Sequence, residues 1–116
     1  MWTYIAALLG STAIFLGAFG AHGLRSRVNP EQLANWHTAA NYHLMHALAV
    51  LALALFANAS GQSIRLPATL FSVGVLFFSG SIYLLVLTGQ KWLGPITPIG
   101  GLLMAAGWIS LIRLVK

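Results

Sequence analysis

The chain has 116 residues, of which 59% are hydrophobic and only 6% are charged, and its mean hydropathy is +0.85. Because a soluble domain carries about 25% charged residues, this composition indicates an integral membrane protein, with one domain expected over residues 1–116. The absence of cysteine excludes disulfides, thiolate metal sites and cysteine nucleophiles. The net charge of +5 comes from cations scattered beside the gaps between apolar runs, which suits contact with lipid headgroups, so nucleic-acid binding is not expected.

The first apolar run, residues 2–21, predicts a membrane-spanning helix. It contains no charged residue, and as a helix it would be about 30 Å long, which matches the hydrocarbon core of a bilayer. The run is too long for a signal peptide, and it lacks the basic segment that precedes one.

The second helix is predicted to begin at Asn29-Pro30-Glu31. Asparagine is a favoured N-cap residue, proline suits the first turn, and glutamate complements the positive end of the helix dipole. The helical pattern continues to residue 57, so the predicted helix is longer than a bilayer core requires. Residues 40–57 are therefore expected to span the membrane, and the earlier turns are expected to project into the headgroup layer. Trp36 and Trp92 are interpreted as interfacial belt residues.

Two further spans are predicted at residues 66–88 and 99–115, after the polar turns "NASGQSIR" and "GQKWLGPITP". Four helices joined by short loops form an all-α membrane bundle that runs up and down. Lysine and arginine are balanced three against three between the two sides, so the positive-inside rule gives no bias. We expect a bacterial inner-membrane protein and, by default, both termini in the cytoplasm. Insertion in both orientations stays open.

Small residues form stripes that are typical of closely packed membrane helices. On the first helix they recur with a 4-3-4-3 spacing, at Ala6, Gly10, Ala13, Gly17 and Gly20. A shorter stripe on the fourth helix consists of Gly101 and Ala105. The stripes are predicted to be helix-packing surfaces, and they raise the hypothesis of a homo-oligomer.

The alternation of the helices brings the most distinctive segments to one end of the bundle, here called the motif end. His43 and His46 are three residues apart on one helix, so they share a face. Because unpaired polar groups are costly at membrane depth, we expect a mutual hydrogen-bonded cluster there. The candidate ligand-binding residues are His22, Tyr42, His43, His46, Ser79, Tyr83, Thr97, Gly100 and Gly101.

Three interpretations of this cluster stay open: a structural lock between loops, a ligand site, and a metal, haem or catalytic centre. The ligand site would form a pocket beneath one headgroup layer for a lipid headgroup, a quinone or a similar amphiphile, with residues 95–101 as a lid or an anion-contacting turn. A metal site is not predicted because only one carboxylate, Glu31, exists to orient imidazoles. Haem between His22 and His46 is an alternative, and no catalytic residue is predicted because a Ser-His pair would lack an acidic partner.

Two other classes of function compete with the ligand site. The chain could be an oligomeric scaffold or partner subunit whose histidines are structural. It could also be a small proton-linked transporter in which His46 carries protons in place of the carboxylate that such transporters use.

Four motifs in order resemble the domain-of-unknown-function 423 family of small bacterial inner-membrane proteins. They are "LGAFGAHGL", "YHLMHALAVLAL", "LFFSGSIYLL" and "ITPIGG" followed by "AAGW". The resemblance implies a four-helix membrane protein, without implying an activity. The family pattern falls on Gly17, Gly20, His22, Tyr42, His46, Ser79, Gly80, Tyr83, Pro98, Gly100, Gly101, Gly107 and Trp108. His43 is a less constant position of that pattern.

Overall fold

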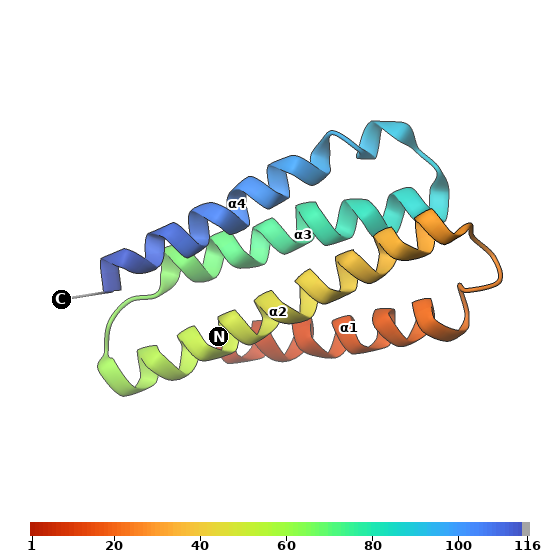
Figure 1. Ribbon diagram of the computed structural model, residues 1–116. Helices are drawn as coiled ribbons and strands as arrows, with labels where there is room; N and C mark the ends of the chain where they lie inside the picture. Colours follow the sequence, from red (N-terminus) through yellow and green to blue (C-terminus); the bar gives the residue numbers. More distant parts are fainter. Residues whose placement is uncertain (115–116) are drawn as a thin grey trace.

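The structure, a computed structural model, describes residues 1–114 and forms an up-and-down bundle of four helices (Figure 1). The helices are α1 (Trp2–His22), α2 (Pro30–Ser60), α3 (Arg65–Thr88) and α4 (Ile96–Ser110), with two short 3-10 helices, η1 (Lys91–Leu93) and η2 (Leu111–Leu114). Four helical segments are long and apolar enough to cross a membrane, the last of them running from η1 through η2. The predicted all-α, four-span fold is therefore confirmed. Helix α4 begins three residues before residue 99, the predicted start of the fourth span, and the predicted end at residue 115 lies outside the described residues.

The start of α2 is fixed by a reciprocal capping arrangement. The backbone N–H of Gln32 donates to the side-chain oxygen of Asn29 at 2.8 Å, and the backbone N–H of Asn29 donates to the side-chain oxygen of Gln32 at 3.0 Å. Pro30 occupies the first turn, and the helix ends at Gly61, whose φ of 73° favours glycine. The predicted start is confirmed. A helix of 31 residues is about 46 Å long, so α2 is longer than the hydrocarbon core.

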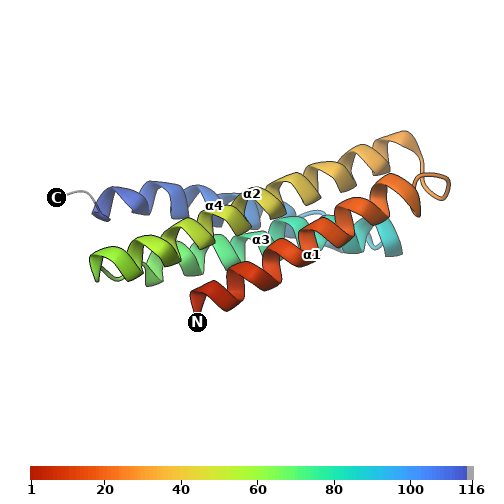
Figure 2. The same cartoon turned by 90° about the horizontal axis from the view of Figure 1, so that it is seen from below.

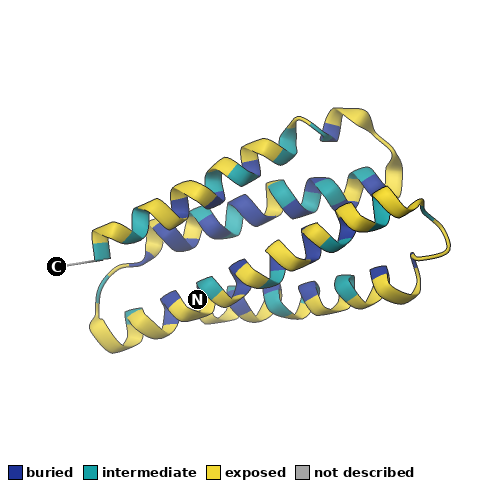
Figure 3. Ribbon diagram, in the orientation of Figure 1, coloured by how far each residue is buried: buried dark blue, intermediate teal, exposed yellow. Residues whose placement is uncertain are grey.

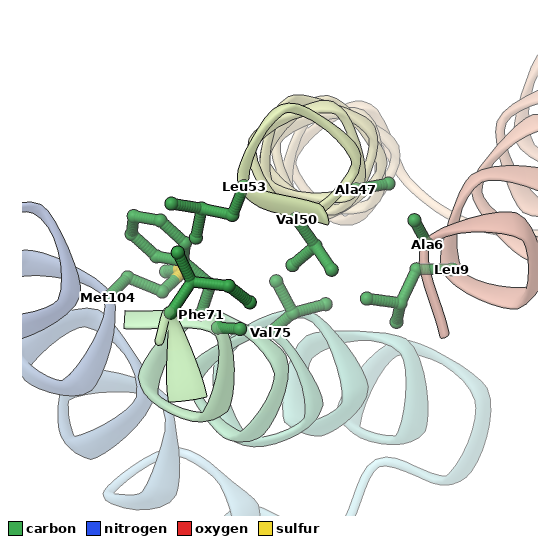
Figure 4. Close-up of a cluster of buried hydrophobic side chains, with 10 residues drawn as sticks. Ala6, Leu9, Ala47, Val50, Leu53, Phe71, Val75 and Met104 are labelled. Atoms are coloured by element: carbon green, nitrogen blue, oxygen red, sulfur yellow. The ribbon is translucent and has the colours of Figure 1, made fainter. Parts of the chain in front are cut away.

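The two middle helices form the centre of the bundle. Viewed along the helices, α2 and α3 face each other through Val50 and Val75, while α1 and α4 lie on opposite sides of this pair (Figure 4). The view from below shows α1 running alongside α2, the helix that it packs against (Figure 2). The motif end gathers the end of α1, the start of α2, the end of α3 and the start of α4, as predicted (Figure 1).

The outer surface of the bundle is apolar. Buried residues lie on the faces turned toward the neighbouring helices, and the outward faces are mostly exposed (Figure 3). Large hydrophobic side chains are among the most exposed, including Phe15 at 74% and Leu102 at 72%. A surface of this kind suits contact with lipid tails rather than with water.

The small-residue stripe of α1 packs against α2 of the same chain. A Cβ added at Gly10 or Gly17 would lie 3.9 Å from the Cβ of an alanine on α2, and one at Gly20 would collide with the ring of Trp36. Ala6 and Ala13 are buried on the same face. The stripe therefore faces α2 of the same chain.

The contact between α3 and α4 uses other small residues than those predicted. Ala105 is exposed, and Gly101 is only partly buried. Gly100 and Gly107 face α3 instead: a Cβ at Gly100 would lie 2.7 Å from the Gly74 carbonyl oxygen and would collide with the backbone nitrogen of Phe78. The prediction chose the neighbouring stripe of α4, because residues one position away are rotated by about 100° around a helix.

Replacing Gly100 tests how close this approach is. We expect Gly100→Ala to lower the free energy of unfolding by at least 1 kcal/mol, because the added methyl group collides with backbone that cannot rotate away. Gly80→Ala is the matched control on α3. Nothing lies within 4 Å of a Cβ there, so alanine should raise helix stability by about 0.5–1 kcal/mol. Unfolding in mixed micelles measures both changes, and equal effects at the two glycines would contradict the close packing.

Cysteine labelling tests the alternation of the helices, because the native chain has no cysteine. Ser26→Cys and Gln90→Cys lie in the two connections at the motif end, and Ser60→Cys lies at the opposite end. An impermeant maleimide applied to intact cells should give the first two variants the same reactivity and Ser60→Cys the opposite one. Different labelling of Ser26→Cys and Gln90→Cys would contradict the up-and-down order.

Candidate functional site

His43 joins three helices through both of its ring nitrogens. Its Nε2 lies 3.1 Å from the Thr12 hydroxyl on α1, and its Nδ1 lies 3.0 Å from the Tyr83 hydroxyl on α3. The His43 side chain is only 5% exposed and Tyr83 is 8% exposed. Because buried polar groups in hydrocarbon must find partners within the protein, the three side chains form a continuous polar chain, here called the His43 relay.

The His43 relay lies deep in the bundle. Thr12 is at the midpoint of α1, a helix whose length matches the hydrocarbon core. Thr12 is thus about 15 Å from the motif end of α1, whereas Tyr83 is five residues from the end of α3. A polar pocket beneath one headgroup layer stays a prediction.

His46 contacts the other side of the bundle. The Trp108 indole N–H on α4 donates to its Nε2 at 3.0 Å, and its Nδ1 lies 2.8 Å from the Tyr42 carbonyl oxygen. Because an indole only donates and a carbonyl only accepts, His46 must carry its proton on Nδ1. The ring of His46 also packs edge-on against Phe71, with centroids 5.3 Å apart. His46 thus ties α2 to α4 in one fixed tautomer.

Two serines of α3 complete the polar contacts between helices. The Ser79 hydroxyl donates to the Ala39 carbonyl oxygen at 2.7 Å and ties α3 to α2. Ser81 and Thr97 share a hydrogen bond of 2.5 Å that ties α3 to the first turn of α4. Residues 95–101 are therefore the packed start of α4, held by this bond and by the Gly100 contact, rather than a lid.

The predicted single cluster is thus divided into separate contacts. His22 is exposed at the end of α1, and among the described residues its side chain has no hydrogen bond. Tyr42 is 41% exposed and stacks on Phe78, with centroids 4.9 Å apart. Of the candidate set, only His43, Tyr83 and Ser79 gather at one place. Gly100 serves helix packing, and a Cβ added at Gly101 would meet the ring of Phe78 at 3.8 Å.

A groove open to the outer surface of the bundle lies beside the His43 relay, between α1 and α3. Its volume is about 290 Å³, and α2 contributes His43 to its lining. The lining residues are Leu8, Leu9, Thr12, Leu16, His43, Val75, Leu76, Ser79, Gly80 and Tyr83. Gly80 opens onto free space, because nothing lies within 4 Å of a Cβ built on it.

Metal and haem ligation can be compared with this geometry. Among residues 1–114, no three histidine or acidic side chains lie close enough together to hold a metal ion. Both ring nitrogens of His46 are engaged, and His22 lies exposed at the end of α1. The pair proposed as haem ligands is therefore not arranged around a common site.

Sequence reasoning missed Thr12 and misplaced Trp36. Trp36 is fully buried rather than interfacial, and its indole donates to the Leu16 carbonyl oxygen at 2.7 Å. The sequence contained a signal for the burial of Trp36: residues spaced three and four apart extend the face of α2 that carries His43 and His46 in both directions. Its members, all buried, are Trp36, Ala39, His43, His46, Val50 and Leu53. Thr12 carried no comparable signal, because a single threonine in an apolar helix commonly bonds its own backbone, as Thr12 also does.

The chain can now be compared with known proteins. The model of a family described as "Protein of unknown function (DUF423)" matches residues 16–101, most of the chain. The chain belongs to the DUF423 family. This confirms the family that the four motifs predicted, and the matched region includes the whole His43 relay except Thr12. No solved structure matches the chain.

The relatives are membrane proteins of several organisms. A UPF0382 membrane protein of Staphylococcus aureus (strain bovine RF122 / ET3-1) is 41% identical over 112 residues, which cover 97% of this chain and 92% of the relative. YwdK of Bacillus subtilis (strain 168), also a UPF0382 membrane protein, is 39% identical over 110 residues, or 93% and 89% of the two chains. A UPF0382 membrane protein of Schizosaccharomyces pombe is 42% identical, with 93% and 95% covered. Their names state a membrane location and no activity, as expected for a multi-pass membrane protein of this family.

Removing the Trp108 donor tests the structural role of His46. We expect Trp108→Phe to lower the free energy of unfolding by about 1 kcal/mol, because it leaves the buried Nε2 of His46 without a partner. Trp92→Phe is the control, since Trp92 is 65% exposed and its indole has no hydrogen bond among the described residues. Unfolding in mixed micelles measures both, and equal stability of the two variants would contradict the role of this bond.

Proposed function

We propose that the chain binds the apolar chain of a membrane amphiphile in the groove between α1 and α3. The observation that carries the proposal is the open space at Gly80, bordered by Ser79 and Tyr83 of the same helix. A groove of about 290 Å³ is near the lower size limit of ligand pockets in proteins, and in a bilayer it is filled from the lipid side. The surface that the groove exposes is almost wholly apolar, which suits an alkyl or isoprenoid chain.

Two competing hypotheses have less support. The oligomeric scaffold relied on the small-residue stripe of α1, and that stripe packs against α2 within the chain. The proton-linked carrier relied on His46, whose ring nitrogens face a carbonyl oxygen and an indole. Neither feature remains available for the role that suggested it, whereas the groove is unfilled by protein.

We also propose that the chain resides in the bacterial inner membrane with both termini in the cytoplasm. The bacterial relatives that are named as membrane proteins support the first part. The labelling described above reads out the second part. Labelling of Ser26→Cys and Gln90→Cys from outside intact cells supports it, and labelling of Ser60→Cys from outside overturns it.

Filling the groove tests the binding function. We expect Gly80→Leu to abolish a co-purifying amphiphile, because the new side chain enters the free space beside α3, while the fold is retained or stabilised by the loss of a helical glycine. Ala105→Leu is the control, because it adds bulk to an exposed position of α4 outside the groove. Native mass spectrometry of gently purified protein should show the same bound mass in the wild type and in Ala105→Leu, and none in Gly80→Leu. Equal occupancy in all three would overturn the proposal.

A further inference from the structure

We propose that the phosphate group of an anionic membrane lipid binds in a polar pocket at the end of the bundle opposite the motif end. The pocket, here called the Arg113 pocket, lies between the turn that precedes α3 and the end of the fourth span. Its volume is about 180 Å³, and its polar lining residues are Gln62, Ser63, Ser110 and Arg113. It shares no residue with the groove between α1 and α3, so this inference does not rest on the proposed function.

The Arg113 pocket lies at the depth of a lipid headgroup. Leu66 borders the pocket in the first turn of a span that begins at Arg65, and Arg113 is the last residue but one of a span that ends at Leu114. The start of α3 and the end of the chain lie side by side there (Figure 1). Because both spans end at this pocket, it faces the headgroup layer, where basic pockets between helices bind lipid phosphates.

Arg113 has no acidic side chain to neutralise it. The chain has a single acidic residue, Glu31, which lies in the first turn of α2 at the motif end. The guanidinium of Arg113 forms no hydrogen bond among residues 1–114, and the residue is exposed. Its donors are therefore available to an anion, and a phosphate can accept two parallel hydrogen bonds from one guanidinium.

Two neutral side chains of the pocket add hydrogen-bond donors. The side-chain amide of Gln62 forms no hydrogen bond within the described part of the chain. The Ser63 oxygen lies 3.5 Å from the backbone nitrogen of Arg65, from which it accepts, so the Ser63 hydroxyl proton stays available. Ser110 differs, because its hydroxyl donates to the Gly107 carbonyl oxygen at 2.7 Å. One positive charge and two neutral donors are complementary to a phosphate.

The surroundings of the pocket favour a lipid phosphate over a free phosphate ion. Leu66 is 43% exposed and Ile112 is 71% exposed, so apolar surface lies beside the polar lining on both helical segments. A free ion would use only the donors. A phospholipid would in addition place its acyl chains on this apolar surface, which adds hydrophobic contact to the same hydrogen bonds.

Three probes test the inference: dioleoyl-phosphatidylglycerol, dioleoylglycerol, which has the same tails and no phosphate, and inorganic phosphate. Their binding to the full chain is measured by native mass spectrometry at an ionic strength of about 0.15 M, where the Debye length is about 8 Å and distant charges are screened. The proteins compared are the wild type, Arg113→Gln, Arg65→Gln and Gly80→Leu. Arg65→Gln is the matched control, because Arg65 is exposed at the same end and does not line the pocket.

We expect the wild type to bind phosphatidylglycerol more tightly than dioleoylglycerol or inorganic phosphate. Arg113→Gln should weaken phosphatidylglycerol by at least about tenfold, the equivalent of one hydrogen bond to a charged group, and should leave dioleoylglycerol unchanged. Arg65→Gln should weaken phosphatidylglycerol by less than about twofold, because screening reduces the effect of a charge outside the pocket. Gly80→Leu should retain the preference for phosphatidylglycerol, because it fills the other site.

Each contrary result overturns a stated part of the inference. Equal losses in Arg113→Gln and Arg65→Gln would show attraction by the overall charge of this end and would overturn the pocket. Equal affinity of the wild type for phosphatidylglycerol and dioleoylglycerol would overturn phosphate recognition, and this comparison needs no variant. Inorganic phosphate bound as tightly as phosphatidylglycerol would overturn the lipid as the source of the phosphate. A preference lost in Gly80→Leu and kept in Arg113→Gln would place the phosphate at the groove instead.

Discussion

The interaction on which the rest of this structure depends is the double hydrogen bonding of His43 in the buried interior of the bundle. An imidazole in the hydrocarbon core is tolerated only if both nitrogens have partners, and here the partners come from α1 and α3. This arrangement holds the two helices at a defined distance from α2 and from each other. Hydrophobic burial cannot supply such a constraint in lipid, because lipid tails are as apolar as the side chains that they contact.

The distribution of small residues explains why the groove lies where it does. Alanine and glycine line the contact of α1 with α2, and glycines allow backbone contact between α3 and α4. These two helix pairs therefore pack closely. The faces of α1 and α3 that border the groove carry leucines, Thr12 and Gly80 instead. Here the larger side chains keep the helices apart, and Gly80 leaves the resulting space unfilled.

The sequence predicted the helices well because their signals are local. The start of α2 follows from Asn29 and Pro30, and the lengths of the four apolar runs are set by the bilayer thickness. The stripe on α1 identified the right face, but a periodic pattern does not say which helix it meets. On α4 the predicted residues, Gly101 and Ala105, lie one or two positions from the packing glycines, Gly100 and Gly107. This shift is enough to place the predicted residues on a face of α4 that does not meet α3 closely.

The candidate site was predicted less well because it depends on angles between helices. Residues three apart on a helix differ by about 60° in direction, which is a small difference for a sequence pattern and a large one inside a bundle. His43 therefore meets α1 and α3, whereas His46 meets α4. His22 lies in the last turn of α1, where water and headgroups replace the need for a protein partner. The expected cluster thus combined His22, His43 and His46, whose side chains the fold directs to different places.

The two buried histidines, His43 and His46, differ in the kind of hydrogen-bonding partner that each has. His46 lies between a carbonyl oxygen, which only accepts, and an indole N–H, which only donates, so one tautomer satisfies both contacts and any other breaks one of them. Such a histidine is a fixed connection between helices. His43 lies between two hydroxyl groups, each of which can donate or accept, so either neutral tautomer of His43 can hydrogen-bond to both of them. The hydrogen bonds of such a relay can reverse their direction without moving a helix. His43, which has two possible tautomers, connects α2 to α1 and α3 beside the groove, whereas His46, which has one, connects α2 to α4.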